Sequence, residues 1–535
     1  MPTLDFKGKQ HIYAHHLTVP YRPLVPDAGR SLNPMEAEDN LIIHGDNLHA
    51  LKALLPHYAG KVKCIYIDPP YNTGNEGWAY NDNVNSLLMR EWLDKTVDGE
   101  DLERHDKWLC MMWPRLHLLK ELLAEDGVIF VSIDDNEQHH LRMMMDEIFG
   151  EESFLAELVW KSRQNRDNRN VTGASIDHEY ILCYGTSIRG DERKTGLYSN
   201  PDNDPRGDWA SGNMVGLATV EARPNLHFDL IDPETGINYG CPPRGWRYDQ
   251  SRMAELASEG RILWPENPEG RPRVKVFLDE LQNTFTGFSS IVADGIFTRN
   301  GTREIEEIFG SRVFEFPKSY ELIRQLILQG CPDDGIVLDS FAGSGTTAHA
   351  VLALNQGDGG NRKFILVECE DYADTITAER VRRVINGVPD ARDTALREGL
   401  GGSFTYCTLG APIDVEGMLT GDELPEYSAL AAYLLHTSDG LSAGTSKLTP
   451  QNEDGLFYSS DSTDYHLLYE PDLDYLRNSD GMLNEERARR ISQLGKQNGR
   501  KAVVFGPGKY IGQRELTSLG IIFCQLPYEI HKAAH

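Results

Sequence analysis

The chain has 535 residues, of which 40% are hydrophobic and 25% charged, and its formal net charge is -29. It is too long for one ordinary hydrophobic core, so we expect two or three domains. The acidic balance argues against a protein that coats nucleic acid through general positive charge, but it allows an enzyme whose basic surface is local.

The composition also bears on compartment and metal content. Hydrophobic runs stay shorter than the roughly 18 residues of a membrane-spanning helix, and residues 1–5 do not resemble the start of a signal peptide. The eight cysteines include no Cys-x-x-Cys pair, which indicates neither a disulfide framework nor a zinc site. We therefore expect a cytoplasmic protein with no bound metal and no membrane contact.

The first elements begin after an N-terminal arm. Residues 1–38 are rich in proline and basic side chains without clear periodicity, so they are predicted to lie on the surface of a domain. Residues 41–44 predict a short strand that ends at a Gly45-Asp46 turn. A helix follows, because leucines recur at helical spacing, and Asp46 is in the position of its cap.

A second strand ends in the most unusual stretch of the chain. Residues 64–67 are all hydrophobic, as in a parallel strand covered on both faces. Asp68-Pro69-Pro70-Tyr71 follows, and the two prolines stop the strand because they lack N–H groups and have a fixed φ. A carboxylate, free carbonyls and a ring at one rigid point could bind an amino group on a flat base. A simple strand stop is the alternative.

The next segment alternates loop, helix and strand. Residues 75–98 are polar and aromatic, with Trp78, Tyr80 and Trp92, and are predicted to form a lid over an extruded base. Residues 108–123 predict a helix and residues 127–134 a buried strand. A further helix over 137–149 would end at Gly150.

From 151 to 313 the periodicity weakens, and arginine, lysine and aromatic residues are interleaved. Such a segment could contact phosphates and base edges of DNA. An ordinary insertion with solvated charge is the alternative. The candidate DNA contacts, together with Asn72 after the Pro-Pro turn, are Lys161, Arg163, Arg166, Arg169, Arg244, Arg247, Arg273 and Lys275.

Two more buried strands follow, over 335–339 and 364–368, after a turn at 314–318 and an amphipathic helix. Together with the two earlier buried strands they end in acids, namely Asp68, Asp134, Asp339 and Glu368. In a doubly wound α/β sheet, ligands bind outside the carboxyl ends of the strands where the strand order reverses. We therefore expect the strands of Asp68 and Asp339 to be neighbours.

A glycine turn follows Asp339. Gly343-x-Gly345-x-x-Ala348, with Glu368 some twenty residues later, also fits a dinucleotide fingerprint, in which glycines let the backbone approach the ligand and the acid binds ribose. It is not a phosphate-binding Walker loop, because no lysine precedes Thr346. A hydride-transfer enzyme would have no use for Asp-Pro-Pro-Tyr, and no convincing general-base histidine is found.

Beyond residue 410 the chain becomes acidic and irregular, and then regains a strand–helix rhythm. Acidic residues far outnumber Lys447 and Arg477 between residues 414 and 480, as on a solvated face. From residue 465 the pattern predicts a small parallel βαβαβ module. No catalytic set is recognisable there, so we interpret this region as packing or docking a partner.

Asp-Pro-Pro-Tyr with Asn72-Thr73-Gly74, and the run from Asp339 to Thr347, resemble the motifs of amino-group DNA methyltransferases that use S-adenosylmethionine. The catalytic motif precedes the cofactor motif, as in the β group, and the nearest likeness is to modification subunits of type III restriction systems. The resemblance covers most of residues 40–410.

The resemblance implies a Rossmann-like doubly wound methyltransferase sheet with permuted motif order. The expected parts are an arm (1–38), a first catalytic part (39–150), a target-recognition region (151–313), a second catalytic part (314–410) and the acidic connection with its α/β module (411–535). It also implies catalytic residues Asp68, Pro69, Pro70 and Tyr71. The implied cofactor contacts are Asp46, Lys318, Asp339, Phe341, Ala342, Gly343, Ser344, Gly345, Thr346, Thr347 and Glu368.

Within this set, Glu368 would hold the ribose of the cofactor and Lys318 its methionine end. The alternative for Lys318 is an ordinary surface lysine, and the alternative for Asp46 is a helix cap. The implied reaction is methylation of adenine N6 in a flipped base of double-stranded DNA. Cytosine N4, a protein or RNA substrate, and a catalytically silent DNA-reading subunit are the alternatives. A homodimer and a helicase-nuclease restriction subunit are the implied partners.

Overall fold

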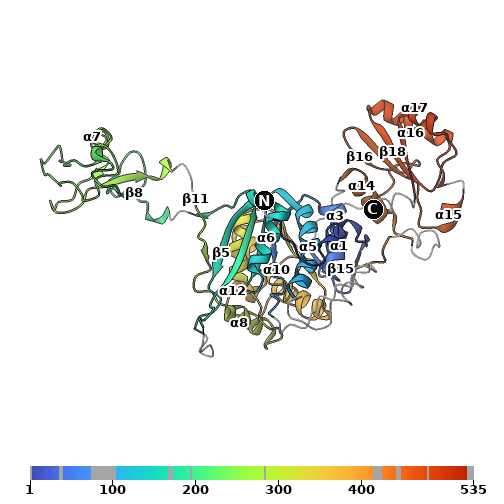
Figure 1. The fold of residues 1–535 in the computed structure, drawn as a ribbon, viewed down its shortest axis with the longest axis horizontal. Coiled ribbons are helices and arrows are strands. Elements are labelled where there is room, and N and C mark those ends of the chain that lie inside the picture. The colour runs from blue at the N-terminus through green and yellow to red at the C-terminus, as the bar shows by residue number, and fades with distance from the viewer. Residues whose placement is uncertain are drawn as a thin grey trace. The chain divides into compact units, whose positions relative to one another are not determined.

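The computed structural model describes residues 3–34, 40–73, 104–166, 173–192, 195–281, 285–413, 424–441, 448–478 and 481–526. The chain divides into two compact units (Figure 1). The main unit comprises Met1–Arg189 and Ser289–His535, and the inserted unit comprises Gly190–Phe288. The predicted lid at 75–98 lies outside the described residues.

A ten-stranded sheet forms the centre of the main unit, in the order β1-β15-β2-β14-β13-β3-β4-β6-β5-β12. The six strands from β15 to β4 are mutually parallel, whereas β1, β6 and β5 introduce antiparallel pairs. This confirms the predicted α/β sheet. The strands are β1 (Leu24–Pro26), β2 (Leu41–His44), β3 (Val62–Ile67), β4 (Leu123–Ile133), β5 (Phe154–Trp160), β6 (Glu179–Gly185), β12 (Ile291–Val292), β13 (Gly335–Asp339), β14 (Arg362–Glu368) and β15 (Thr405–Leu409).

Helices cover both faces of this sheet. Successive side chains of a strand point to opposite faces. Ile65 of β3 joins the core formed with α3 (Asn47–Tyr58), α5 (Arg104–Leu122) and α6 (Gln138–Phe149). Its neighbour Cys64 faces the end of α9 (Tyr320–Gly330), where a Cβ on Gly330 would lie 3.3 Å from the Cys64 sulfur. Strands buried from both sides explain the continuous hydrophobic runs in the sequence.

Further helices complete the main unit. Gly345 begins α10 (Thr346–Asp358), which packs against α9 and β14. The others near the sheet are α1 (Lys9–Ile12), α2 (His15–Thr18), α8 (Thr298–Phe309), α11 (Glu379–Asn386) and α12 (Thr394–Glu398). The N-terminal segment contributes to the main unit, since β1 pairs with β15 and Phe6 and Ile12 enter the core beside α5.

The inserted unit has a small core of its own, formed by Met214, Leu230, Trp246, Met253, Leu256, Ile262 and Val274. Its elements are β7 (Asp191–Glu192), β8 (Trp209–Asn213), α7 (Gln250–Ser258), β9 (Ile262–Leu263), β10 (Arg273–Phe277) and β11 (Phe285–Thr286). It is narrower than the predicted region 151–313, because β5, β6 and β12 belong to the large sheet.

The C-terminal part forms a four-stranded sheet in the order β16-β17-β18-β19, of which the last three strands are parallel. This agrees with the predicted module. The preceding stretch is not wholly irregular, because α14 (Tyr427–Asp439) lies within it and packs on α3. The elements here are β16 (Leu456–Ser459), β17 (Thr463–Leu467), α15 (Leu473–Arg477), α16 (Glu485–Asn498), β18 (Lys501–Gly506), α17 (Gln513–Leu519) and β19 (Ile521–Gln525).

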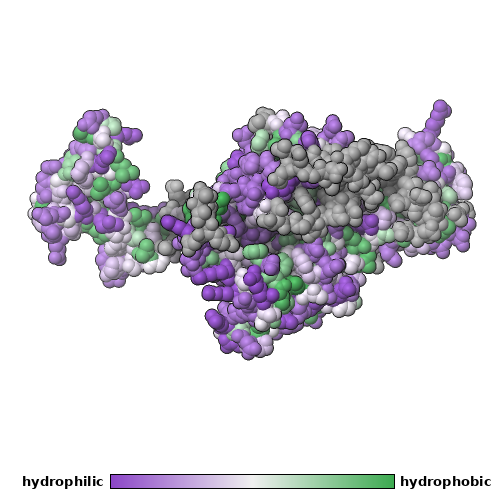
Figure 2. All heavy atoms as spheres, turned by 60° about the horizontal axis from the view of Figure 1, so that its bottom comes forward, coloured by the Kyte–Doolittle hydropathy of each residue, from purple (hydrophilic) through white to green (hydrophobic). Residues whose placement is uncertain are grey.

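The described surface is mixed in character. Hydrophilic side chains predominate on the face in Figure 2, interrupted by separate hydrophobic areas. The strongly exposed hydrophobic residues come from distant parts of the sequence and include Leu197, Leu217, Phe316 and Tyr510. Among the described helices, none is long and hydrophobic enough to cross a membrane.

Candidate active site

The two loops singled out in the sequence lie at one edge of the sheet. β3 and β13 are parallel neighbours, with Ile65 opposite Leu338. The chain therefore leaves both strands on the same side, at Asp68 and Ser340. A cavity of about 530 Å³ lies there and is lined by Asp68–Asn72 from the first loop and by Phe341–Ser344 from the second. This volume is in the range of small-molecule sites.

A cluster of four polar side chains occupies the Asp68 side of the cavity. The ammonium nitrogen of Lys318 lies 2.9 and 2.8 Å from the two Asp68 oxygens and donates to the Tyr71 hydroxyl at 2.8 Å. Glu179, the first residue of β6, accepts a hydrogen bond from the Tyr71 hydroxyl at 3.0 Å and lies 3.3 Å from Lys318. The cluster thus holds the ring and the carboxylate of the first loop together.

The charges of this cluster support one another. Burial disfavours the Lys318 ammonium, but the Asp68 and Glu179 carboxylates outweigh burial and raise the pKa of Lys318 above its ordinary value. Burial, with the same two carboxylates, raises the pKa of the Tyr71 phenol. Tyr71 therefore stays protonated and can donate to Glu179.

The proline carbonyls differ in their hydrogen bonding. The indole nitrogen of Trp108 donates to the Pro70 carbonyl at 2.7 Å. No described residue donates to the Pro69 carbonyl. The loop is therefore fastened at Pro70, and the Pro69 oxygen keeps its capacity to accept a hydrogen bond from a ligand.

The glycine loop is held by side chains from behind. Gly343 and Gly345 have φ angles of 50° and 78°, which favour glycine. The Gly343 N–H donates to Glu368 at 2.7 Å, and its carbonyl accepts from the Thr377 hydroxyl at 2.6 Å. The buried Arg380 guanidinium donates to the hydroxyl oxygens of Ser344 and Thr346. These contacts hold the glycine loop in a conformation in which its backbone lines the cavity.

The two strand-end acids behind this loop are strongly buried. Asp339 accepts from the Phe341 N–H at 3.0 Å and from the Thr347 hydroxyl at 2.5 Å. Glu368 accepts from the N–H groups of Gly343, Cys369 and Glu370. Burial raises the pKa of each of these two carboxyl groups to about 7.

Most of the expected cofactor contacts line this cavity, namely Lys318, Asp339, Phe341, Ala342, Gly343, Ser344, Thr346 and Thr347. Asp46, Gly345 and Glu368 do not line it. Asp46 caps α3 and pairs with Arg115 at 3.3 Å, so the capping alternative is observed. Lys318 is directed to Asp68, not exposed on the surface, and no cofactor is needed to explain its position.

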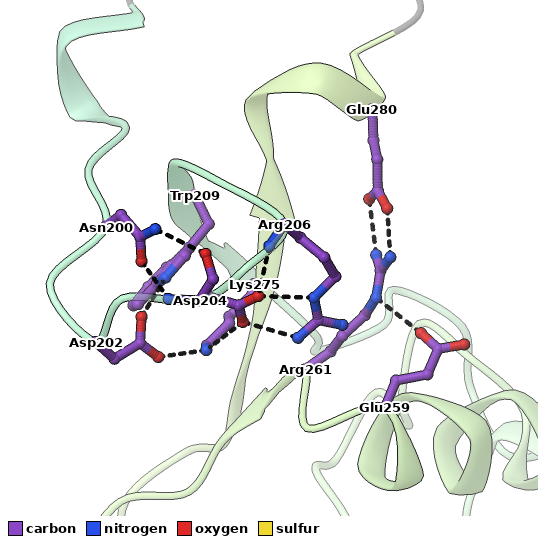
Figure 3. A network of polar contacts seen from close by, with 9 residues as sticks. All are labelled: Asn200, Asp202, Asp204, Arg206, Trp209, Glu259, Arg261, Lys275 and Glu280. Atoms are coloured by element: carbon purple, nitrogen blue, oxygen red, sulfur yellow. Dashed lines mark hydrogen bonds and ion pairs between the residues drawn. The ribbon is translucent and has the colours of Figure 1, made fainter.

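The candidate DNA contacts separate into two groups. Arg244 and Arg247 are exposed in the inserted unit, and Lys161, Arg163 and Arg166 are exposed after β5. Lys275 is instead buried between Asp202 and Asp204, with the latter at 2.9 Å (Figure 3). The structure therefore gives Lys275 an internal role in place of the predicted DNA contact.

The three remaining candidates are less available or not described. Arg273 is bound to the hydroxyl and carbonyl oxygens of Ser211. Asn72 is buried and donates to Glu137, so it too is engaged within the protein. Arg169 lies outside the described residues.

Sequence reasoning missed several residues around the cavity. Glu179 lies 108 positions from its partner Tyr71, in a stretch read as part of an insertion. Tyr372 lines the cavity and meets Phe314 edge to face at 5.5 Å. Neither carries a local signal, and only the pairing of β6 with β4 would have placed Glu179 here.

Comparison with known proteins gives one family match and several relatives. The family model described as DNA methylase matches residues 62–379. The StyLTI Mod subunit, a type III restriction-modification enzyme of Salmonella typhimurium, is 31% identical over 480 residues, which cover 83% of this chain and 71% of the relative.

Two further relatives have similar identities. The EcoP15I Mod subunit of Escherichia coli is 31% identical, with coverage of 69% of this chain and 64% of the relative. The type II methyltransferase M.KpnI of Klebsiella pneumoniae is 33% identical, with coverage of 64% and 83%. Among solved structures, the M1.HpyAVI-SAM complex has a TM-score of 0.29 at 16% identity, covering 64% of this chain and 98% of that one.

Proposed function

Because the chain belongs to the DNA methylase family, we propose that it transfers a methyl group from S-adenosylmethionine to N6 of adenine at a specific DNA sequence. The prediction of a DNA methyltransferase similar to type III modification subunits is confirmed by the family match and by the relatives. The target atom, the cofactor contacts and the partners are parts of the proposal.

One observation carries the proposal. The Asp68–Tyr71 loop and the glycine loop, some 270 positions apart, line the same cavity. The cavity has room for a nucleoside-sized ligand, and the left-handed backbone of Gly343 allows close approach to it. S-adenosylmethionine would supply an electrophilic methyl group on its sulfonium. The residues from Phe341 to Thr347 would hold it, with Tyr372 and Phe314 beside it.

Asp68 and Pro69 would activate the target nitrogen. The lone pair of adenine N6 is delocalised into the ring, which makes N6 a weak nucleophile. If the Asp68 carboxylate and the Pro69 carbonyl each accept one N6 hydrogen, N6 becomes more tetrahedral and its lone pair becomes available. Positive charge grows on N6 during methyl transfer, so these two acceptors stabilise the transition state more than the ground state. N6 then loses one proton, through Asp68, to water.

Tyr71 and Lys318 would orient the substrate and the carboxylate. The Tyr71 ring would stack on the base, an interaction whose loss typically costs about 1–3 kcal/mol. Lys318 binds both Asp68 oxygens and thereby fixes the orientation of the carboxylate and of its remaining lone pairs. The base must leave the duplex to reach this cavity, because N6 is otherwise hydrogen-bonded inside the pair.

Two other functions are alternatives to methylation of adenine N6. Cytosine N4 presents a similar amino group, although in the resembling family the Asp form goes mainly with adenine and a Ser form with cytosine. Analysis of the nucleosides from treated DNA distinguishes N6-methyladenine from N4-methylcytosine. A silent DNA-reading subunit would fail to bind S-adenosylmethionine in a titration, whereas the intact glycine loop supports binding.

The proposed partners are those implied by the resemblance to type III modification subunits. Double-stranded DNA is the substrate, a second copy of the chain completes a homodimer, and a helicase-nuclease subunit associates with it. Light scattering and co-purification with the products of neighbouring genes test these partners. A monomer that co-purifies with no subunit would contradict the two protein partners.

The central experiment compares two acids at strand ends. Asp68→Ala should reduce transfer of labelled methyl groups to DNA by at least about 10²–10³-fold, as for other lost transition-state contacts, while cofactor binding persists. Asp134→Ala is the matched control, because Asp134 directly follows β4, its carboxylate accepts from the N–H and side-chain amide of Asn136, and it does not line the cavity. Undiminished transfer by Asp68→Ala would contradict the proposal.

A further inference from the structure

Glu137 forms a buried polar cluster beside the first loop. It precedes α6, and its side chain is fully buried. Its carboxylate accepts hydrogen bonds from the Asn72 side-chain amide, from His105 Nδ1 at 2.6 Å and from His140 Nδ1 at 2.8 Å. Three segments, namely the end of the first loop, the start of α5 and the start of α6, therefore meet at one carboxylate.

The chemistry of a carboxylate fixes how these partners are oriented. An ionised carboxylate only accepts hydrogen bonds, so Asn72 must present its NH2 group and each histidine its Nδ1–H. No lysine or arginine among the described residues pairs with Glu137. The three donors therefore compensate its burial, and removing one weakens that compensation.

Asn72 connects this cluster to the catalytic loop. It directly follows Tyr71 and has a φ angle of 56°, in the left-handed region. Its amide also donates to the Arg104 carbonyl at 3.4 Å. The hydrogen bond that Asn72 donates to Glu137 thus holds the left-handed backbone at the position after Tyr71.

We propose that Glu137 is a positioning residue, which holds Asn72 and through it keeps the Asp68–Tyr71 segment in the conformation needed for methyl transfer. This inference rests on the proposed function for its catalytic consequence. It predicts a loss of rate without loss of cofactor affinity, because Glu137 does not line the cavity and the glycine loop is held by other residues.

A site for a divalent cation is the alternative interpretation of this cluster. The ligand atoms of the two histidines and of Glu137 lie within 4.8 Å of one another. Two ligands about 2.1 Å from one ion in tetrahedral geometry would be roughly 3.4 Å apart. The observed 2.6 and 2.8 Å are hydrogen-bond distances, and the Asn72 amide donates to the same oxygen as His105. The geometry therefore favours a hydrogen-bonded clamp.

A double-mutant cycle on the full-length protein tests the proposal. Glu137→Gln keeps the side-chain size but sets an NH2 group against a donor. Asn72→Gly removes the amide and still allows the left-handed backbone. We expect kcat to fall about 10–100-fold in each single variant, since a misplacement near 1 Å can cost 10²-fold. The Kd for S-adenosylmethionine should change less than twofold in Glu137→Gln, because Glu137 does not line the cavity. The double variant should be no slower than Asn72→Gly.

Asp146→Asn is the matched control for destabilisation of the same helix. Asp146 lies near the other end of α6 and accepts from Tyr184 and Arg142. This variant should retain the wild-type kcat at a temperature where all the variants are folded. Multiplicative losses in the double variant, or an equal loss in Asp146→Asn, would overturn the proposal.

A measurement that does not need activity separates this inference from the proposed function. In hydrogen exchange, the amides of residues 71–73 should exchange faster in Glu137→Gln than in Asp146→Asn. If the wild type methylates no DNA, the proposed function fails, and faster exchange alone still supports the clamp. Unchanged exchange overturns it, as would one equivalent of bound zinc in the purified wild type that Glu137→Gln loses.

Discussion

The ammonium nitrogen of Lys318 lies 2.9 and 2.8 Å from the two carboxylate oxygens of Asp68, across 250 positions of sequence. This contact joins the turn before α9 to the loop after β3, so the second catalytic part directly holds the first. Glu179 lies 3.3 Å from the same ammonium. One ammonium group therefore pairs with two carboxylates beside the cavity.

Replacing Lys318 should leave these two carboxylates without a cation. Removing one partner of a buried ion pair typically costs about 3–5 kcal/mol, and Lys318 and Asp68 are partly exposed, so we expect Lys318→Met to lose about 2–3 kcal/mol of unfolding free energy. Glu179→Gln in the Lys318→Met background should restore part of that loss. Urea denaturation of the wild type and of these two variants measures the loss, and a double variant less stable than Lys318→Met would contradict the charge argument.

The glycine loop allows a comparison of two similar positions. Gly345 has a φ angle of 78°, and a Cβ there would lie 3.0 Å from the Thr377 carbonyl oxygen, a backbone atom. At Gly343 the nearest atom to a new Cβ is the Phe314 ring at 3.4 Å, an ordinary contact. The left-handed backbone costs about 1 kcal/mol at either position.

We therefore expect Gly345→Ala to lose about 2–3 kcal/mol of unfolding free energy and Gly343→Ala about 1 kcal/mol. Denaturation without cofactor measures both. Because Gly343 lines the cavity and Gly345 does not, Gly343→Ala should have the larger effect on the Kd for S-adenosylmethionine relative to its effect on stability. Equal stability losses would show that the Thr377 contact relaxes.

Much of this arrangement was predictable because its signals are local. Residues 64–67 of β3 and 336–338 of β13 are continuous hydrophobic runs, an acid follows each run, and the chain beyond contains proline or glycine. The rule for doubly wound sheets then predicted the two strands to be neighbours, as they are. Register, burial and the cavity follow from that pairing.

Other parts had no local signal. Glu179 and Glu137 approach the first loop only because β6 and α6 follow β4 in space, and an isolated glutamate does not reveal its partner. β5 and β6 were included in the recognition region because polar, glycine-containing loops surround them. α14 was missed because the acidic charge around it dominated the interpretation, although its buried Leu430 and Leu434 have helical spacing.

Two basic residues of the inserted unit should respond differently to mutation. Arg247 is exposed, whereas Lys275 bonds to Asp202 and Asp204 and lies 5.1 Å from the centre of the Trp209 ring (Figure 3). Arg247→Ala should weaken DNA binding and reduce the salt slope of binding by about one if the side chain contacts a phosphate. Its melting temperature should stay unchanged.

Lys275→Met should instead lower the melting temperature, because two carboxylates lose their common cation. Differential scanning fluorimetry and a salt titration of DNA binding, performed on both variants, separate the two roles. A Lys275→Met protein with wild-type stability and a reduced salt slope would restore the original DNA-contact prediction for this residue.

The buried Asp339 makes stability depend on pH. Burial raises the pKa of its carboxyl group from 3.8 to about 7 in the folded protein. The folded state therefore binds this proton more tightly than the unfolded chain does. The corresponding stabilisation is complete below about pH 4 and is lost as the pH rises to about 7. At about 1.4 kcal/mol for each unit of pKa difference, its upper limit is roughly 4 kcal/mol.

Asp339→Asn removes this titration while keeping the side-chain shape and one acceptor oxygen for Phe341 or Thr347. The unfolding free energy of the wild type, minus that of Asp339→Asn, should therefore fall as the pH rises from about 4 to about 7. Chemical denaturation of the cofactor-free proteins measures the difference, and Asp5→Asn, at an exposed position, gives the baseline for loss of one carboxylate. A difference that rises with pH would mean that Asp339 is held ionised by its two donors, in which case burial is not the dominant influence on this carboxyl group.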